Sequence, residues 1–385
     1  MTRLALIRQR YAADTGVERV SEAALEALLE RGVAMSLYTR EWPRTRLQLI
    51  EPVLCNPFYI GQVWRDWSFG RSVCRLIAKA PPELVESHER VLCCDIYRAD
   101  EGVHQVRLEE YWRDAPAYRR WLAVSNPYHR YLVAMEQRLF TTPSLRAVIC
   151  GSKMVRDEIR ERFGLPDAKL SVIYNAVDSD VFSPALRQHR EAVRRKLGVP
   201  DAATVFLIVG SDYQRNGVAA AIAALPRLSQ DTYLFIVGRD NARARYKRLV
   251  SRLGVARRVA LLGEQGDVKP FYGAADAFVL PTPYDPCPNA VLEAMACGLP
   301  VVTTPKCGVA ELVREHGAGF VGPAHDIDQL ASHMMRLTDA RTRETLGGCA
   351  REAVLPLTPA AITLQLVLLY RDLLAAAHAG KLARG

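Results

Sequence analysis

The segment from Leu280 to Thr304, LPTPYDPCPNAVLEAMACGLPVVTT, constrains the fold of this chain more than any other stretch. The apolar run that ends at Pro281 predicts a buried strand, and Pro288 suits the start of a helix, where its missing N–H is no loss. The helix is expected to end at Gly298, and a β-branched strand follows from Val301. The segment therefore predicts strand, loop, helix and strand in succession, as in a parallel α/β sheet.

Two acids lie on either side of the predicted helix start, Asp285 in the loop and Glu293 in the second helical turn. Between them, near Asn289 and Ala290, the first turn of the helix offers backbone N–H groups to an anion. A ligand with a phosphate group between hydroxyl-bearing groups would use all three parts. The alternative is an ordinary α/β helix in which Asp285 caps or neutralises the positive helix end.

This segment resembles the nucleotide-sugar motif of glycosyltransferase family 4, the retaining enzymes with the GT-B fold. The run CGLPVVTT after the helix is also similar to that family's pattern. The resemblance implies that Glu293 accepts hydrogen bonds from both ribose hydroxyls of a donor, while Asp285 holds hydroxyls of the transferred sugar. Asn289 and Ala290 would then lie at the diphosphate. Asp285 is one methylene shorter than the glutamate usual in the family.

A second candidate loop, Gly210 to Gly217 with the sequence GSDYQRNG, follows an apolar run and precedes a predicted helix. Its small residues let the backbone approach a ligand, and Arg215 can bind phosphate oxygens through its forked guanidinium. The resemblance makes Arg215 a cation for the donor diphosphate, although plain turn chemistry also explains the glycines. Asn216 occupies a position where relatives carry lysine, so we expect Asn216→Lys to tighten donor binding.

In the N-terminal half, the resemblance implies a glycine-rich loop over the donor phosphates, with Gly16 retained and Thr15 in place of a second glycine. The polar segment Cys94 to His104 follows an apolar stretch. Its residues Asp95 and His104 are candidates for contacts with the transferred hexose or the acceptor. A single histidine in such a segment is also commonly structural, and both interpretations stay open for His104.

Strand and helix patterns alternate along the chain, which predicts an α/β fold of two Rossmann-like domains with parallel sheets. The GT-B fold implied by the resemblance would place these domains facing each other across a cleft. We expect an acceptor-binding domain at residues 1–184 and a nucleotide-sugar-binding domain at 185–385, with the last helix packing back on the first. The expected strands are Leu4–Ile7, Val33–Tyr38, Val91–Leu92, Ala147–Cys150, Val172–Tyr174, Thr204–Val209, Tyr233–Val237 and Val259–Leu262.

The composition, 49% hydrophobic and 24% charged residues, is that of a globular protein. No stretch approaches the roughly 18–20 apolar residues of a membrane span, and the N-terminus lacks the pattern of a signal peptide. The nine cysteines show no metal-binding spacing, so we expect reduced thiols in a cytoplasm. Neither a metal site nor a cofactor is predicted, and the nucleotide sugar would be a co-substrate.

The net charge of +9 fits an anionic lipid surface, a phosphorylated acceptor or merely a solvated surface. No nucleic-acid-binding signature accompanies it. The segment Arg107 to Phe140 interleaves arginines with tyrosines and tryptophans, which suits a membrane interface or a long solvated helix whose aromatic side chains are core. The family resemblance, whose pattern is similar to that of the lipopolysaccharide-core glucosyltransferases, implies that this segment contacts a membrane, so we expect a cytoplasmic protein attached peripherally to the inner face of the membrane.

The resemblance extends over nearly the whole chain, and its pattern is similar to that of the lipopolysaccharide-core glucosyltransferases. It implies a retaining, metal-independent enzyme that moves a hexose from a nucleotide sugar, with UDP-glucose as the expected donor. The acceptor would be a saccharide or a lipid-linked molecule such as lipopolysaccharide core. The alternatives are a non-catalytic GT-B scaffold with a decayed donor site, or an epimerase or phosphorylase on the same fold.

Overall fold

The computed structural model describes residues 3–10, 29, 32–41, 50–113 and 115–382 of the chain. It contains two compact units, which we describe separately. Unit 1 comprises Met1–Ala176 and Pro359–Gly385, and unit 2 comprises Val177–Thr358. The sequence analysis placed the boundary after residue 184. The structure places it eight residues earlier and assigns the last helix, α15 (Pro359–Leu382), to unit 1.

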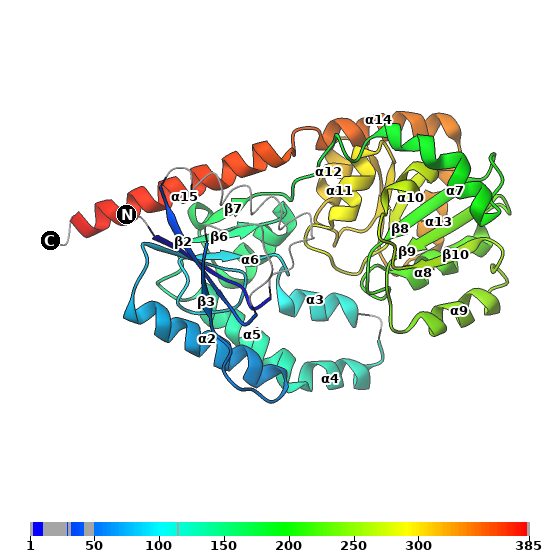
Figure 1. The fold of residues 1–385 in the computed structure, drawn as a ribbon. Helices are drawn as coiled ribbons and strands as arrows, with labels where there is room; N and C mark the ends of the chain where they lie inside the picture. Colours follow the sequence, from blue (N-terminus) through cyan, green and yellow to red (C-terminus); the bar gives the residue numbers. More distant parts are fainter. Residues whose placement is uncertain (1–2, 11–28, 30–31, 42–49, 114, 383–385) are drawn as a thin grey trace. The chain divides into compact units, whose positions relative to one another are not determined.

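Unit 1 is built on a seven-stranded parallel sheet with the strand order β3-β2-β1-β4-β5-β6-β7 (Figure 1). Its strands are β1 (Arg3–Ile7), β2 (Ala34–Thr39), β3 (Glu51–Leu54), β4 (Leu84–Ser87), β5 (Ile96–Arg98), β6 (Ala147–Cys150) and β7 (Leu170–Val172). Its other helices are α2 (Gly61–Lys79), α3 (His104–Tyr111), α4 (Ala117–Ser125), α5 (Pro127–Phe140) and α6 (Lys153–Phe163). The strand order reverses between β1 and β4, and such a switch point is where parallel α/β sheets bind ligands.

Strands β4 and β5 differ from the sequence prediction, which placed a strand at Val91–Leu92. Those two residues lie in the loop between the strands. Both strands carry buried polar groups: Glu86 in β4 accepts a hydrogen bond from the Tyr370 hydroxyl of α15, and Arg98 in β5 pairs with Asp100. A buried strand is normally recognised as a run of apolar residues. Each of these short strands contains a charged residue whose partner lies outside the strand, so that apolar pattern is absent.

Unit 2 is built on a six-stranded parallel sheet with the order β10-β9-β8-β11-β12-β13. The strands are β8 (Thr204–Val209), β9 (Thr232–Val237), β10 (Val259–Gly263), β11 (Ala277–Leu280), β12 (Val301–Thr303) and β13 (Gly319–Val321). The helices are α7 (Arg190–Leu197), α8 (Val218–Ala224), α9 (Arg243–Arg252), α10 (Lys269–Ala274), α11 (Asn289–Ala296), α12 (Ala310–Glu315), α13 (Ile327–Arg336) and α14 (Ala340–Val354). The prediction of two parallel α/β domains is confirmed, and the predicted β8, β9 and β10 coincide with the structure within one residue at each end.

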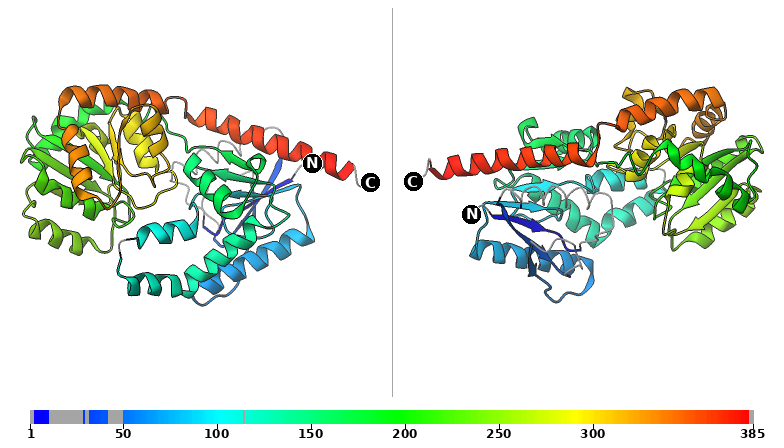
Figure 2. Two further views of the ribbon diagram at one scale, coloured as in Figure 1. Left: turned by 180° about the vertical axis from the view of Figure 1, so that it is seen from behind. Right: turned by 45° about the horizontal axis from the view of Figure 1, so that its top comes forward.

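Helix α15 packs along unit 1 (Figures 1 and 2). Its residues Ile362, Leu366 and Tyr370 are buried, and Arg146 donates a hydrogen bond to the carbonyl of Leu373 at 2.6 Å. By length and composition alone, the helical segment Ala340–Ala376 could cross a membrane, which the sequence analysis did not expect of any stretch. Ile362, Leu366, Val367 and Tyr370 are core contacts of unit 1, whereas Leu364 and Leu368 are exposed, and 33% of the apolar window is buried.

Two of the nine cysteines form a disulfide, between Cys74 in α2 and Cys93 in the loop that follows β4. The expectation that all cysteines are reduced thiols is therefore wrong for this pair. Their Cα atoms are 5.6 Å apart. The bond ties α2 to the loop between β4 and β5.

The segment Arg107–Phe140 is not one long helix but parts of three, α3, α4 and α5. Helix α4 has no buried residue, and its Trp121 is 68% exposed. The interpretation in which the aromatic side chains of this segment are core is therefore wrong for α4.

Candidate functional site

The predicted donor residues of unit 2 gather where the strand order reverses. Strands β8 and β11 are neighbours although β9 and β10 lie between them in sequence, so the loops after β8 and β11 leave the sheet side by side. Arg215 belongs to the first loop and Asp285 to the second. The carboxyl ends of parallel strands at such a switch point form the crevice in which open α/β sheets bind ligands.

The loop after β8 is shaped by Gly217, which has a positive φ of 66°. A Cβ atom at this position would lie 2.0 Å from the carbonyl oxygen of Pro281 in the neighbouring loop, so only glycine fits. The Thr282 hydroxyl also donates a 2.6 Å hydrogen bond to the carbonyl of Arg215. The two loops are thus held against each other by close backbone packing at Gly217 and by the hydrogen bond from Thr282. These contacts fix the position of the Arg215 backbone.

Arg215 and Asp285 form an ion pair, with Nε 3.2 Å from Oδ2. Asp285 is only 6% exposed. Its backbone N–H donates to the carbonyl of Lys306 at 2.9 Å, and its carbonyl accepts from the N–H of Gly308 at 2.8 Å. The structure therefore brings together a cation and an acid that lie 70 residues apart in sequence. This arrangement offers a positive group and a hydrogen-bond acceptor at one edge of the sheet.

Glu293 projects from the second turn of α11 and is oriented by a buried tyrosine. The Tyr272 hydroxyl donates to Glu293 Oε2 at 2.7 Å. Burial and the nearby charge of Glu293 raise the pKa of Tyr272 well above its usual value, so the phenol keeps the proton that it donates. Asn289 and Ala290 begin α11, whose first turn presents backbone N–H groups. The helix thus supplies amides at its start and a carboxylate one turn later.

Asn216 belongs to the framework of the loop. Its side chain is 5% exposed, and Nδ2 donates to the carbonyl of Ser211 at 2.9 Å. A Cβ atom at Gly210 would approach this amide within 2.6 Å, so the two residues pack closely. A lysine at residue 216 would lose this bond, and the structure therefore argues against the expectation that Asn216→Lys tightens donor binding.

Asp95 was predicted to contact sugar, but the structure gives it a different role. It precedes β5, at the amino edge of the unit 1 sheet, and Oδ2 accepts the backbone N–H of Val85 at 2.8 Å. Ligands bind parallel α/β sheets at the opposite edge. Burial raises the pKa of Asp95, and its backbone also accepts from Arg146 and Ala147. Asp95 therefore joins strands and is withdrawn as a sugar contact.

His104 begins α3 and is fully buried. Its Nδ1 lies 2.8 Å from Arg107 Nη2, and its Nε2 lies 3.0 Å from His129 Nδ1. Burial, with the positive charges of Arg107 and Arg90, lowers its pKa to about 3. The ring is therefore neutral near pH 7 and cannot reach a substrate directly. Of the two interpretations the structure favours the structural one, in which His104 positions Arg107 and His129.

This buried ring predicts a pH dependence of stability. In the unfolded chain the pKa of His104 is near 6.5, and in the folded chain it is about 3. Between these two values the unfolded state binds one more proton than the folded state. The free energy of unfolding therefore falls as the pH is lowered. His104→Gln keeps a neutral hydrogen-bonding side chain but removes this proton. We expect the variant to lose less thermal stability than the wild type between about pH 7.5 and about pH 5.5.

The measurement is simplified by the tryptophans, all five of which precede residue 122 and report on unit 1. Melting followed by tryptophan fluorescence therefore follows the unit that contains His104. The exposed His316 of unit 2 supplies the control, since His316→Gln should leave the pH dependence of this signal unchanged. Equal losses of stability in wild type and His104→Gln would contradict the assignment.

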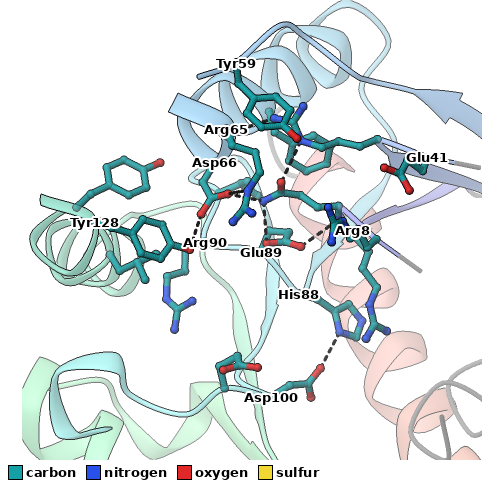
Figure 3. Close-up of a pocket in the computed structure, with 18 of the residues that line it drawn as sticks. Arg8, Glu41, Tyr59, Arg65, Asp66, His88, Glu89, Arg90, Asp100 and Tyr128 are labelled. Atoms are coloured by element: carbon teal, nitrogen blue, oxygen red, sulfur yellow. Dashed lines mark hydrogen bonds and ion pairs between the residues drawn. The ribbon is translucent and has the colours of Figure 1, made fainter. Parts of the chain in front are cut away.

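Unit 1 has a cavity of its own at its switch point, with a volume of 440 Å³ (Figure 3). Gln9 follows β1 and Glu89 follows β4, and the Gln9 side chain donates to Glu89 at 3.2 Å and to Asp66 at 3.1 Å. The Tyr128 hydroxyl donates to the other oxygen of Asp66 at 2.9 Å. Carboxylates, amides and tyrosines so arranged suit a ligand rich in hydroxyl groups. Glu89 was not predicted because β4 was not, and nothing local in the sequence marks Gln9, Asp66 and Tyr128 as neighbours.

The wall of this cavity also holds a buried cation, Arg40, which follows β2. Its guanidinium donates to Gln9, Asn56 and Ser68 and lies over the ring of Tyr59 at 4.8 Å. None of the described residues forms an ion pair with it. Arg40 therefore places a positive charge in a cavity that also holds the carboxylates of Asp66 and Glu89, so the lining carries charges of both signs. Gly16 and Thr15, predicted to form a loop over the donor phosphates, lie outside the described residues.

Two family models match the chain, one for each half. "Glycosyltransferase Family 4" matches residues 15–181, and "Glycosyl transferases group 1" matches residues 189–352. The second match contains Arg215, Asp285 and Glu293. Together the two matches span most of both units.

Curated relatives carry compatible names. An uncharacterized glycosyltransferase of Methanocaldococcus jannaschii is 32% identical over 213 residues, which is 54% of this chain and 55% of that protein. The lipopolysaccharide glucosyltransferase WaaG of Escherichia coli is 29% identical over 312 residues, 80% of this chain and 81% of that protein. This chain thus covers about half the length of the first relative and most of the second.

Solved structures share the fold. The structure of WaaG, a glycosyltransferase involved in lipopolysaccharide biosynthesis, superposes with a TM-score of 0.79 at 22% identity, covering 94% of this chain and 98% of that one. Anabaena HepE in complex with UDP-glucose superposes with a TM-score of 0.70 at 18% identity, covering 97% and 100%. With both family models and the fold in agreement, the chain belongs, as predicted, to glycosyltransferase family 4, the group 1 enzymes with the GT-B fold.

Proposed function

We propose that the protein is a retaining, metal-independent glycosyltransferase that moves a hexose from a nucleotide sugar to a saccharide or lipid-linked acceptor. The observation that carries this proposal is the pairing of Arg215 with Asp285 at 3.2 Å at the switch point of unit 2. Glu293 stands on the helix that follows the same loop, oriented by Tyr272. Family membership supports the reaction class.

Each side chain then has a role suited to its chemistry. Arg215 and the amides at the start of α11 hold the diphosphate, where negative charge grows as the donor bond breaks. Glu293 accepts hydrogen bonds from the ribose hydroxyls, and Asp285 accepts them from the transferred sugar. The leaving phosphate would take the proton of the acceptor hydroxyl on the same face of the sugar, which gives retention without a protein nucleophile.

UDP-glucose is the donor we propose. WaaG is named a glucosyltransferase, and HepE was solved with UDP-glucose, which supports this choice. An α-1,3-galactosyltransferase of Escherichia coli that uses UDP-Gal is also similar, at 30% identity over 48% of this chain, so UDP-galactose is the second candidate. The hydroxyl-binding cavity of unit 1, with Gln9, Asp66 and Glu89, is the proposed acceptor site.

Calorimetry against UDP-, GDP- and ADP-glucose and UDP-galactose tests the proposal. We expect UDP-glucose to bind most tightly and Arg215→Gln to weaken it, while Arg195→Gln, an exposed arginine of α7, leaves it unchanged. If none of the four binds, the protein is the non-catalytic scaffold. If the bound sugar is converted to an epimer without any acceptor, the chain is an epimerase.

We further propose that α4 attaches unit 1 to the cytoplasmic face of a membrane that carries the acceptor. Four of its apolar side chains are exposed, Tyr118, Trp121, Leu122 and Val124, with Arg119 and Arg120 beside them. Tyrosine and tryptophan prefer the membrane–water interface, and arginine adds attraction to anionic headgroups. A helix with this composition and no buried residue fits an interfacial helix.

The α4 proposal predicts that Trp121→Ala weakens sedimentation with lipid vesicles about tenfold, because it removes a large interfacial side chain. The control is Trp67→Ala, which removes an exposed tryptophan from α2. Both variants should melt as the wild type does. If Trp121→Ala sediments as the wild type does, α4 is not the attachment site.

A further inference from the structure

One stretch of unit 2 is strongly cationic. Residues 241–263 contain seven cations and no acidic residue. The cations are Arg243, Arg245, Lys247, Arg248, Arg252, Arg257 and Arg258. In unit 1, by contrast, arginines of the aromatic segment pair with acids, as Arg107 does with Glu101 and Arg113 with Glu110. Around α9, by contrast, no acidic residue lies among the cations in sequence.

Two of the seven cations serve the fold. Arg258 is buried and donates to the carbonyls of Leu225 and Ser229, and Arg243 donates to the carbonyl of Leu261. The other five are exposed: Arg245, Lys247, Arg248, Arg252 and Arg257. No ion pair to any of these five occurs among the residues that the structure describes. Their positive charges face solvent without a compensating acid.

Three of the exposed cations share one face of α9. Arg245, Arg248 and Arg252 are spaced three and four residues apart, which places them in one stripe along a helix. Helices α8 and α9 are neighbours (Figure 1), and the stripe borders a hollow of 840 Å³ that both helices line. On the α8 side the hollow is lined by Ala219, Ala220 and Ala223, and His325 lies at its edge. No acidic side chain is among the described residues that line it.

The hollow thus combines a cationic wall with an apolar wall that carries no polar side-chain group. We propose that it binds the phosphate groups of anionic phospholipids and so gives unit 2 a membrane contact of its own. The guanidiniums of α9 would hold the phosphate oxygens, and the alanine wall of α8 would contact the glycerol and first methylenes. This inference goes beyond the proposed function and does not depend on the α4 proposal.

The surface fits lipid better than nucleic acid. Single-stranded nucleic acids are bound on exposed aromatic side chains on which the bases stack. Between residues 219 and 257 no large hydrophobic side chain is exposed, and Tyr246 of α9 is buried. A free phosphate ion would use the arginine stripe but leave the alanine wall without a function.

The experiment uses the full chain and vesicles of phosphatidylcholine alone or mixed with phosphatidylglycerol. We expect the triple variant Arg245→Gln, Arg248→Gln, Arg252→Gln to bind the mixed vesicles on the order of 100-fold more weakly than the wild type. The matched control, Arg195→Gln, Lys196→Gln, Arg314→Gln, removes the same charge from exposed positions of unit 2. The control should lose less than about threefold, since its charges lie outside the hollow.

A second variant tests the hollow without removing a cation. Ala223→Glu places a carboxylate opposite the arginine stripe and should also weaken binding to mixed vesicles, while calorimetry with UDP confirms that unit 2 is folded. Equal losses in the triple variant and its control would show that only net charge matters and would overturn the site. Unchanged binding in the triple variant would overturn it too. If the triple variant loses affinity for single-stranded RNA but keeps its affinity for the vesicles, the surface binds nucleic acid and the proposed phospholipid site is overturned.

Discussion

Arg194→Met is expected to lower the stability of unit 2 by about 3 kcal/mol, the lower end of the cost of breaking a buried ion pair, because Arg190 still pairs with Asp276. Arg194 is 0% exposed, and its Nη2 lies 2.6 Å from Asp276 Oδ2. It also donates to the carbonyls of Ala274 and Ala203 at 3.0 and 2.8 Å. Methionine fills much of the volume but leaves the two carbonyls without this donor, while Asp276 keeps Arg190 at 2.8 Å and the N–H of Val205 at 2.8 Å.

The measurement separates the two units. All five tryptophans lie in unit 1, so circular dichroism follows both units in urea while tryptophan fluorescence follows unit 1 alone. We expect Arg194→Met to lower the urea concentration at which unit 2 unfolds, which only circular dichroism reports. The fluorescence transition of unit 1 should stay unchanged. Arg195→Met is the control, because Arg195 is exposed and pairs only with exposed Glu191, which contributes about 0–1 kcal/mol. Equal shifts for both variants would show that the buried pair is not the cause.

Glu293→Gln is expected to weaken UDP binding about 10- to 100-fold. A charged acceptor in a protected site contributes about 1.5–3 kcal/mol to each hydrogen bond that it accepts, and glutamine loses the charge while keeping the shape. The glutamine can still accept from Tyr272, whose hydroxyl now lies 2.7 Å from Oε2. The loss would therefore reflect the ligand contact rather than a disordered helix.

Calorimetry with UDP and with UDP-glucose measures this effect. Glu344→Gln, which removes an exposed carboxylate from α14, should leave both affinities unchanged. Tyr272→Phe should cause a smaller loss than Glu293→Gln, because it removes the orienting hydroxyl but leaves the charge. Unchanged affinities in Glu293→Gln for both ligands would remove Glu293 from the donor site.

The sequence by itself predicted five of the six strands of unit 2, all but β13, together with the residues of its candidate site. Strands β8, β9 and β11 are mainly apolar runs that are each followed by a glycine or a proline, so the local pattern was sufficient to find them. The loops after β8 and β11 carry their chemistry in short motifs, which is why Arg215 and Asp285 could be named before the structure was known. Their contact at 3.2 Å follows from a parallel sheet that places both strand ends at the same edge.

Other features were decided only by the tertiary structure. The buried Glu86 of β4 is satisfied by Tyr370, 284 residues away, so no local pattern could reveal that strand or the cavity residue Glu89 that follows it. Asp95 and His104 look like site residues in sequence because they are polar, but the fold buries them and uses them to bond strands and neighbouring side chains. Polarity is visible in a sequence. Whether a polar group faces a ligand or a buried partner depends on contacts between distant segments, and only the folded chain supplies these.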